Sequence, residues 1–73
     1  QDVDLYGAKL ADGDRLTHVI GPRRGVWVQM IRGMIKANGE VIVAGDGMAL
    51  IREPDITMTA HEDAEFLLFD MAL

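Results

Sequence analysis

Short apolar segments alternate with turn signals along the whole chain. Residues 34–37 and 40–43 flank the pair Asn38-Gly39, which readily adopts the positive φ angles of a tight hairpin turn. Residues 44–47 then reverse the chain again. Further turn signals stand at Gly25 and at residues 12–14, 21–22, 53–55 and 61–63. The segments between these signals are too short for ordinary helices, so the pattern predicts a succession of strands.

The alternation of apolar and polar residues supports strands in two further places. Three apolar residues alternate with two threonines over residues 56–60, as in a strand that buries one face. Leu16, His18 and Ile20 share one face of an extended segment in the same way. Both segments are therefore predicted to turn one face toward a core.

Residues 25–35 are the strongest competitor for a helix, because they are long and apolar. They are also rich in β-branched residues and are interrupted by Gly33, so we predict two strands there. The regular turn spacing favours antiparallel pairing, since parallel pairing needs a connection of a dozen or more residues. The sequence therefore predicts an all-β fold, a small antiparallel β-sandwich or barrel.

Two predicted strands are apolar on both faces. One contains Trp27 and Ile31, and the other contains Leu67 and Phe69. A strand of this kind needs a cover on its outer side as well as a core on its inner side. Loops and chain termini would provide that cover, or else a neighbouring domain or subunit would, and we favour the neighbour. Trp27, Ile31, Leu67 and Phe69 are therefore the candidate interface residues.

Length and composition narrow the class of protein. The 73 residues correspond to one domain, residues 1–73, and a chain this small buries only about 60–65% of its unfolded surface. The absence of cysteine excludes a disulfide-stapled secreted scaffold and fits a cytoplasmic location. No apolar run approaches the ~20 residues of a membrane span, so we expect no membrane partner.

Because the chain begins at Gln1 and residues 3–10 already have strand character, we expect an excised piece of a longer protein.

The distribution of charge argues against a nucleic-acid partner. The net charge is −5, and residues 53–73 hold six acidic residues but no lysine or arginine, so this part would repel a phosphate backbone. Arg23 and Arg24 are adjacent at a turn, and no clustered basic face accompanies them. We expect them to lie in a solvated loop, and their role stays open.

Few residues are suited to catalysis. The chain has no serine or cysteine, which excludes the common nucleophiles. His61 stands beside two acidic residues in a predicted turn, where neighbouring side chains point apart. His18 is expected to be packed or hydrogen-bonded in a structural role. We therefore predict no catalytic residue, no cofactor-binding residue and no metal site, with His18 as the one remaining candidate ligand.

The motifs, taken in order, resemble a known family. The relevant segments are Gly13-x4-His18 and residues 27–33, 38–39, 44–47 and 62–70. Their order and spacing are similar to the C-terminal cupin domain of pirin-like proteins, and more narrowly to bacterial pirin-like proteins related to quercetin 2,3-dioxygenase. The resemblance covers nearly the whole chain and implies a jelly-roll-like cupin barrel, a double-stranded β-helix. It also implies a bicupin parent whose N-terminal barrel binds a mononuclear divalent metal through three histidines and a glutamate. Flavonols such as quercetin would be opened there with dioxygen.

This chain departs from the metal-binding cupin pattern that the resemblance supplies. Counting back seven residues from Gly33 reaches Val26 in the place of the glutamate of the first motif. Ile20 follows His18 where a second histidine would stand, and Ile56 occupies the histidine position of the second motif. A mononuclear site needs three or four ligands, so we expect no metal on this chain.

Three functional hypotheses remain. In the first, the chain is a non-catalytic C-terminal cupin that supports the metal-binding N-terminal cupin of a quercetin 2,3-dioxygenase-like oxidoreductase. In the second, it is the protein-interaction module of a non-enzymatic pirin-like protein. In the third, it is a free-standing barrel that binds an apolar ligand in its cavity. The expected partners are the N-terminal cupin of the same protein and a second copy of this chain.

Overall fold

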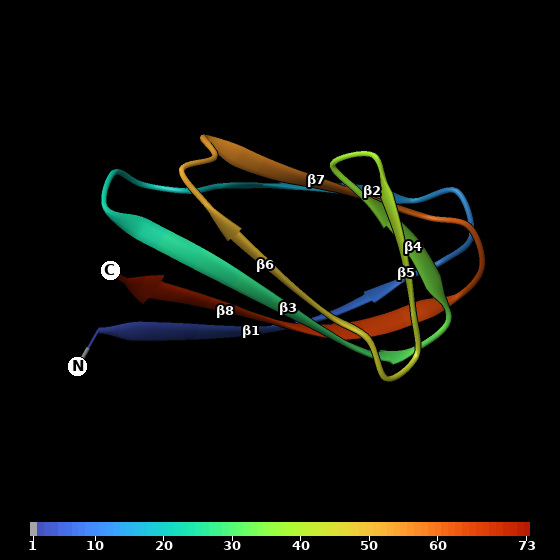
Figure 1. The fold of residues 1–73 in the computed structure, drawn as a ribbon. Coiled ribbons are helices and arrows are strands. Elements are labelled where there is room, and N and C mark those ends of the chain that lie inside the picture. The colour runs from blue at the N-terminus through green and yellow to red at the C-terminus, as the bar shows by residue number, and fades with distance from the viewer. Residues whose placement is uncertain (1) are drawn as a thin grey trace.

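Residues 2–73 form eight strands in the computed structural model (Figure 1). The strands are β1 (Val3–Leu10), β2 (Arg15–Val19), β3 (Arg24–Arg32), β4 (Met34–Ala37), β5 (Glu40–Val43), β6 (Gly47–Ile51), β7 (Asp55–Ala60) and β8 (Ala64–Ala72). Within these residues no helix is long and apolar enough to cross a membrane. The succession of strands that the turn signals predicted is confirmed, including a first strand over residues 3–10.

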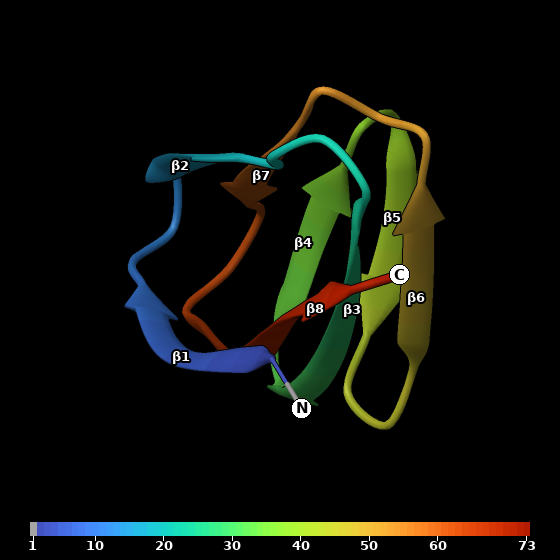
Figure 2. The ribbon, with the colours of Figure 1, turned by 90° about the vertical axis from the view of Figure 1, so that its left-hand side faces the viewer.

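The strands form two four-stranded sheets that face one another. The first sheet has the order β1-β8-β3-β6 and the second has the order β2-β7-β4-β5, and the neighbouring strands pair antiparallel. Figure 2 shows the two layers with β1 and β2 on one side and β5 and β6 on the other. Most connections cross from one sheet to the other, as in a jelly roll. The predicted all-β antiparallel fold is therefore confirmed.

The hairpin predicted around Asn38 and Gly39 joins β4 and β5. Asn38 has a φ of 44° and Gly39 a φ of 88°, as a turn with two left-handed residues requires. The side chain of Asn38 donates from Nδ2 to the carbonyl of Asp55 and accepts the backbone N–H of Thr57 at 2.9 Å. The turn residue therefore also fastens the hairpin to β7.

Gly25, inside β3, and Gly33, directly after it, have different structural roles. Gly33 ends the strand with a φ of 82°, so residues 25–35 contain two strands, as predicted. The prediction of a turn at Gly25 is wrong, because this glycine lies inside β3. A Cβ at Gly25 would lie only 3.1 Å from a methyl carbon of Ile51 and 3.1 Å from one of Leu73. Close approach of side chains, rather than a turn, accounts for this glycine.

The core lies between the sheets and follows the predicted alternation. In β7, Ile56, Met58 and Ala60 are buried while the two threonines are only half-buried. Leu16 and His18 of β2 pair with Met58 and Ile56, so they face the other sheet as expected. The buried apolar residues are Ile20, Val26, Val28, Met30, Ile35, Ala37, Ile42, Leu50, Ile56, Met58, Ala60, Ala64, Phe66 and Leu68. Burial of each large side chain contributes about 1.5–3 kcal/mol, and this holds the two sheets together.

Candidate functional site

One charged residue projects into the core from β8. The alternation of this strand places Phe66, Leu68 and Asp70 on its inner face, and Asp70 is only 5% exposed. A carboxylate at a core-facing position needs hydrogen-bonding or charged partners, because an unpaired buried charge is strongly unfavourable. Sequence reasoning missed Asp70 as a site residue. The period of two along residues 64–70 was the signal that marked it as an inward carboxylate.

Asp70 is paired with two side chains from other strands. Nε2 of His18 lies 2.6 Å from Oδ2 of Asp70, and Nε of Arg24 donates to Oδ1 at 2.5 Å. Burial alone would raise the pKa of Asp70, but the hydrogen bonds from His18 and Arg24 outweigh it and hold that pKa below its usual value. Asp70 is therefore ionised and can only accept, so Nε2 of His18 carries the proton and donates.

Arg24 extends the network to the beginning of the chain. It donates to Asp2 at 2.7 Å, and its guanidinium lies 3.5 Å from Asp4. Hydrogen bonds to Asp2 and Asp70 raise the pKa of Arg24. The expectation that both arginines lie in a solvated loop is therefore wrong for Arg24. It is the first residue of β3, its side chain is 20% exposed, and it holds the inward carboxylate in place.

The structure gives His18 a packed, hydrogen-bonded place. Its side chain is 22% exposed, and its ring lies 5.5 Å from the ring of Tyr6 in a tilted arrangement. Val26, Ile20 and Ile56, which stand in ligand positions of the cupin pattern, are all buried in the apolar core. Residues 2–73 contain no group of three or more histidine, cysteine, aspartate or glutamate side chains placed to hold a metal ion. Apart from His18, hydrocarbon side chains fill the positions where the pattern has ligands.

A small pocket opens beside His18, between the edge strands β1 and β2. Its volume is about 230 Å³, and it is lined by Tyr6, Gly7, Ala8, Leu16, Thr17, His18, Phe66 and Leu68. This volume is below the range of about 300–1,000 Å³ that is typical of small-molecule sites.

The outer side of the first sheet carries a continuous apolar surface. Cross-strand partners share a face of a sheet, and the register places apolar residues opposite one another on all four strands. One row contains Leu5, Phe69, Trp27 and Ala49, and the next contains Val3, Met71, Gly25 and Ile51. We call this surface the outer face and define it by Val3, Leu5, Trp27, Ala49, Ile51, Leu67, Phe69 and Met71. Leu5 is 58% exposed and Trp27 is 37% exposed, so much of the outer face is open to solvent.

Two glycines shape the outer face. The indole of Trp27 lies against Gly47, where any Cβ would overlap the ring, and its Nε1 donates to Gln29 at 3.2 Å. Leu67 lies over Gly7, with a methyl carbon 3.9 Å from the position of a Cβ. The absence of a side chain at Gly47 therefore leaves the room that the indole of Trp27 occupies.

The four candidate interface residues do not all belong to this surface. Trp27, Leu67 and Phe69 lie on the outer face. Ile31 is exposed, but it lies at an irregularity of β3, between Met30 and Arg32, where the pairing with β8 shifts. Beyond it, Arg32 forms an ion pair of 3.1 Å with Glu65. Ile31 therefore stands at the charged edge of the outer face.

Known proteins are similar to this chain both in sequence and in fold. The chain is similar to quercetin 2,3-dioxygenase of Escherichia coli K12, with 37% identity over 71 residues that cover 97% of this chain and 31% of that protein. It matches a pirin-like protein of Caulobacter vibrioides with the same identity and coverage. The crystal structure of the bacterial pirin YhhW from Escherichia coli in complex with nickel(II) superimposes with a TM-score of 0.96 and 36% identity. That match covers 99% of this chain and 31% of that one.

These relatives are much longer than the chain, which spans about a third of their length. The family of quercetinase C-terminal cupin domains matches residues 1–71. This match agrees with the two-sheet fold and with the motifs that the sequence shares with pirin-like proteins. The protein therefore belongs to the family of quercetinase C-terminal cupin domains.

Proposed function

We propose that this chain is the metal-free C-terminal cupin domain of a two-cupin protein and that its outer face packs on a metal-binding N-terminal cupin. The observation that carries the proposal is the pair of apolar rows that crosses all four strands of the first sheet. The chain also spans only 31% of relatives named quercetin 2,3-dioxygenase, which leaves room for a second domain in a parent of that size.

The composition of the outer face fits a protein partner. Trp27 and Phe69 stand at its centre, and aromatic side chains are enriched at the centres of interfaces while charges are depleted there. Lys9, Glu65 and Arg32 form a charged row at one end, as at the rim of an interface. Apolar area removed from water contributes about 25 cal/mol per Å², so a covering domain would be held mainly by this surface.

In this proposal the chain supports the chemistry without performing it. Opening a flavonol with dioxygen needs a metal centre, and the described residues offer no ligand set for one. The parent would be a quercetin 2,3-dioxygenase-like oxidoreductase whose N-terminal cupin holds the metal. This domain would stabilise that cupin and shape the approach to its site.

Sedimentation and binding measurements test the docking surface. We expect the 73-residue chain alone to self-associate, and we expect Leu5→Lys or Phe69→Lys to make it monomeric. Val41→Lys is the matched control, since Val41 is equally apolar and 57% exposed but lies on the second sheet. The chain should bind the separately prepared N-terminal cupin of its parent, and the outer-face variants should not. A wild-type chain that stays monomeric and does not bind that cupin would contradict the proposal.

A second measurement separates the dioxygenase from a non-enzymatic pirin-like parent, in which the same face would serve protein interaction. Consumption of quercetin is followed by absorbance for the chain alone and for the metal-loaded parent. We expect turnover by the parent and none by the chain. An inactive parent whose two domains still bind would favour the interaction protein. Metal-dependent turnover by the 73 residues alone would refute the metal-free role.

A further inference from the structure

Two arginines adopt a backbone conformation that arginine rarely takes. Among the described residues other than glycine, those with a positive φ are Arg23 at 61°, Asn38 at 44° and Arg52 at 63°. Asn38 occupies a hairpin turn, where this conformation is usual. An arginine in the left-handed region is disfavoured, because its Cβ lies close to the following carbonyl oxygen. Such residues persist where the surrounding structure holds them, and they are concentrated at functional sites.

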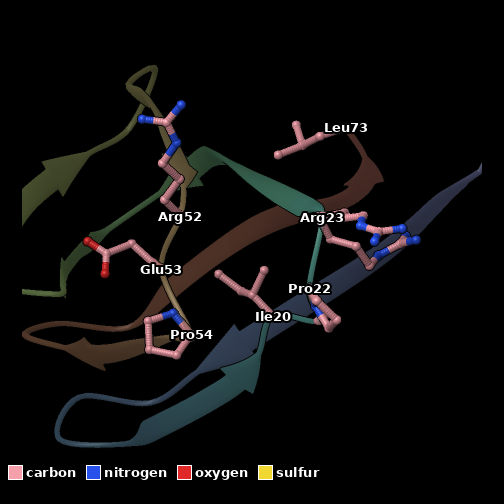
Figure 3. Close-up of a pocket in the computed structure, with 9 residues that line it drawn as sticks. Ile20, Pro22, Arg23, Arg52, Glu53, Pro54 and Leu73 are labelled. Carbon is pink, nitrogen blue, oxygen red and sulfur yellow. The ribbon is translucent and has the colours of Figure 1, made fainter.

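Both arginines line the same pocket at one end of the sandwich (Figure 3). The pocket has a volume of about 700 Å³, within the range of about 300–1,000 Å³ of small-molecule sites. It is lined by Ile20, Gly21, Pro22, Arg23, Arg24, Arg52, Glu53, Pro54 and Leu73. Figure 3 shows Arg23 and Arg52 on opposite sides, with Ile20 between them. The pocket therefore joins an apolar floor to a basic rim.

Backbone hydrogen bonds fix the segments that form the pocket. The N–H of Ile20 donates to the carbonyl of Pro54 at 2.9 Å, which joins the loop after β2 to the loop after β6. The N–H of Leu73 donates to the carbonyl of Arg23 at 2.9 Å, which joins the end of the chain to the same loop. Main-chain contacts thus pre-form the pocket, and one of them holds the backbone of Arg23.

The charges at the rim are available to a ligand. Arg24 is engaged by Asp70 and Asp2, whereas Arg23 and Arg52 form no ion pair within residues 2–73, and both are exposed. Glu53 is the acidic residue of the lining, and in Figure 3 its carboxylate extends to the side away from Arg23. Three of the seven basic residues of an acidic chain line this one pocket. Sequence reasoning found no basic residue to add to the pair Arg23-Arg24, because Arg52 is distant in the sequence.

We propose that this pocket binds a small organic oxyanion, a carboxylate or phosphate group attached to an apolar body. The guanidinium groups of Arg23 and Arg52 would swing in to bind the oxygens, since their planar donors match both groups. The apolar body would lie on Ile20, Pro54 and Leu73. The left-handed backbone at the two arginines would be retained because it places their side chains on the rim.

Calorimetric titration of the 73-residue chain with benzoate, phenyl phosphate, inorganic phosphate and benzyl alcohol tests the proposal. We expect benzoate or phenyl phosphate to bind at least tenfold more tightly than benzyl alcohol, which has the ring without the charge. Inorganic phosphate has the charge without the ring and should also bind at least tenfold more weakly than phenyl phosphate. The stronger of the two aromatic anions identifies the preferred oxyanion. Equal binding of all four compounds, or no binding at millimolar concentration, would overturn the proposal.

Glycine substitutions separate a binding role from a folding role. Arg23→Gly and Arg52→Gly should each raise the midpoint of thermal unfolding, because glycine adopts a positive φ without strain. The same variants should weaken binding of the preferred anion at least fivefold, and the double variant should abolish it. Arg15→Ala, an exposed arginine of β2 outside the pocket, should bind as the wild type does. Undiminished binding by the stable double variant would overturn the proposal.

Discussion

The imidazole of His18 on one sheet lies 2.6 Å from the carboxylate of Asp70 on the other. This contact joins the layers at a point where the rest of the core is hydrocarbon. Because Asp70 is ionised and can only accept, Nε2 of His18 donates the hydrogen bond in this contact. The side chain that the cupin pattern marks as a candidate ligand therefore has its Nε2 engaged by a carboxylate of its own chain.

Replacing Asp70 tests how much this network stabilises the fold. Asp70→Asn removes the negative charge that faces Arg24 and leaves one side-chain oxygen to accept hydrogen bonds where Asp70 has two. We expect the free energy of unfolding at pH 7, measured with urea, to fall by about 2–3 kcal/mol. Glu62→Gln, in an exposed bend, is the control and should change it by less than about 0.5 kcal/mol. Similar values for the two variants would contradict a structural role for the network.

The lowered pKa of Asp70 predicts a pH dependence. The folded state binds the proton of Asp70 more weakly than the unfolded state does, in which the pKa is about 3.9. The contribution of Asp70 to stability is therefore complete above that value and is lost as the pH falls through the lower folded pKa. Between pH 7 and pH 2, the free energy of unfolding measured with urea should decrease less for Asp70→Asn than for the wild type. Parallel curves would refute this assignment.

Phe66 and Phe69 lie three residues apart in β8 and point to opposite sides. Phe66 is fully buried in the core, and Phe69 is half-buried on the outer face. Phe66→Ala should cost about 3–5 kcal/mol of monomer stability, whereas Phe69→Ala should cost about 1–2 kcal/mol and reduce self-association. Urea unfolding and sedimentation measure the two effects. Equal destabilisation without a change in association would make Phe69 an ordinary core residue.

Gly33 and Gly39 have the same backbone conformation but different surroundings. Their φ angles are 82° and 88°. A Cβ at Gly39 would meet open space, whereas a Cβ at Gly33 would overlap the backbone of Asp63 and Ala64. Gly39→Ala should therefore cost only the left-handed strain of about 1–2 kcal/mol, and Gly33→Ala roughly 2 kcal/mol more. Urea unfolding measures both values, and equal losses would contradict the close packing at Gly33.

Metal analysis tests the hydrocarbon-filled ligand positions. After incubation with nickel, iron, zinc or copper and dialysis, the 73-residue chain should retain well below one equivalent, because His18 lacks the companion ligands that a mononuclear site needs. Val26, Ile20 and Ile56 stand in their places. Retention of about one equivalent that is lost on His18→Ala would contradict the metal-free assignment.

The sequence by itself determined the features that depend on a few neighbouring residues. Asn38-Gly39 defined the hairpin of β4 and β5 because a two-residue turn requires positive φ angles. The period of two identified the buried face of β7 and the two apolar faces of β3 and β8, since alternate side chains of a strand point to opposite sides. The order of the turn motifs was enough to indicate the family, because each turn depends on the few adjacent residues that form it.

Only the tertiary structure decided which distant residues meet. Asp70 is separated by 52 residues from His18 and by 46 from Arg24, and no local pattern pairs them. Arg52 and Arg23 are likewise distant in the sequence and meet only at the pocket. Position 25 needs a glycine because Ile51 and Leu73 approach it across the fold. Sheet order and the packing of one sheet on the other set these contacts. Both arise from the burial of apolar surface by the whole chain, which no short segment specifies alone.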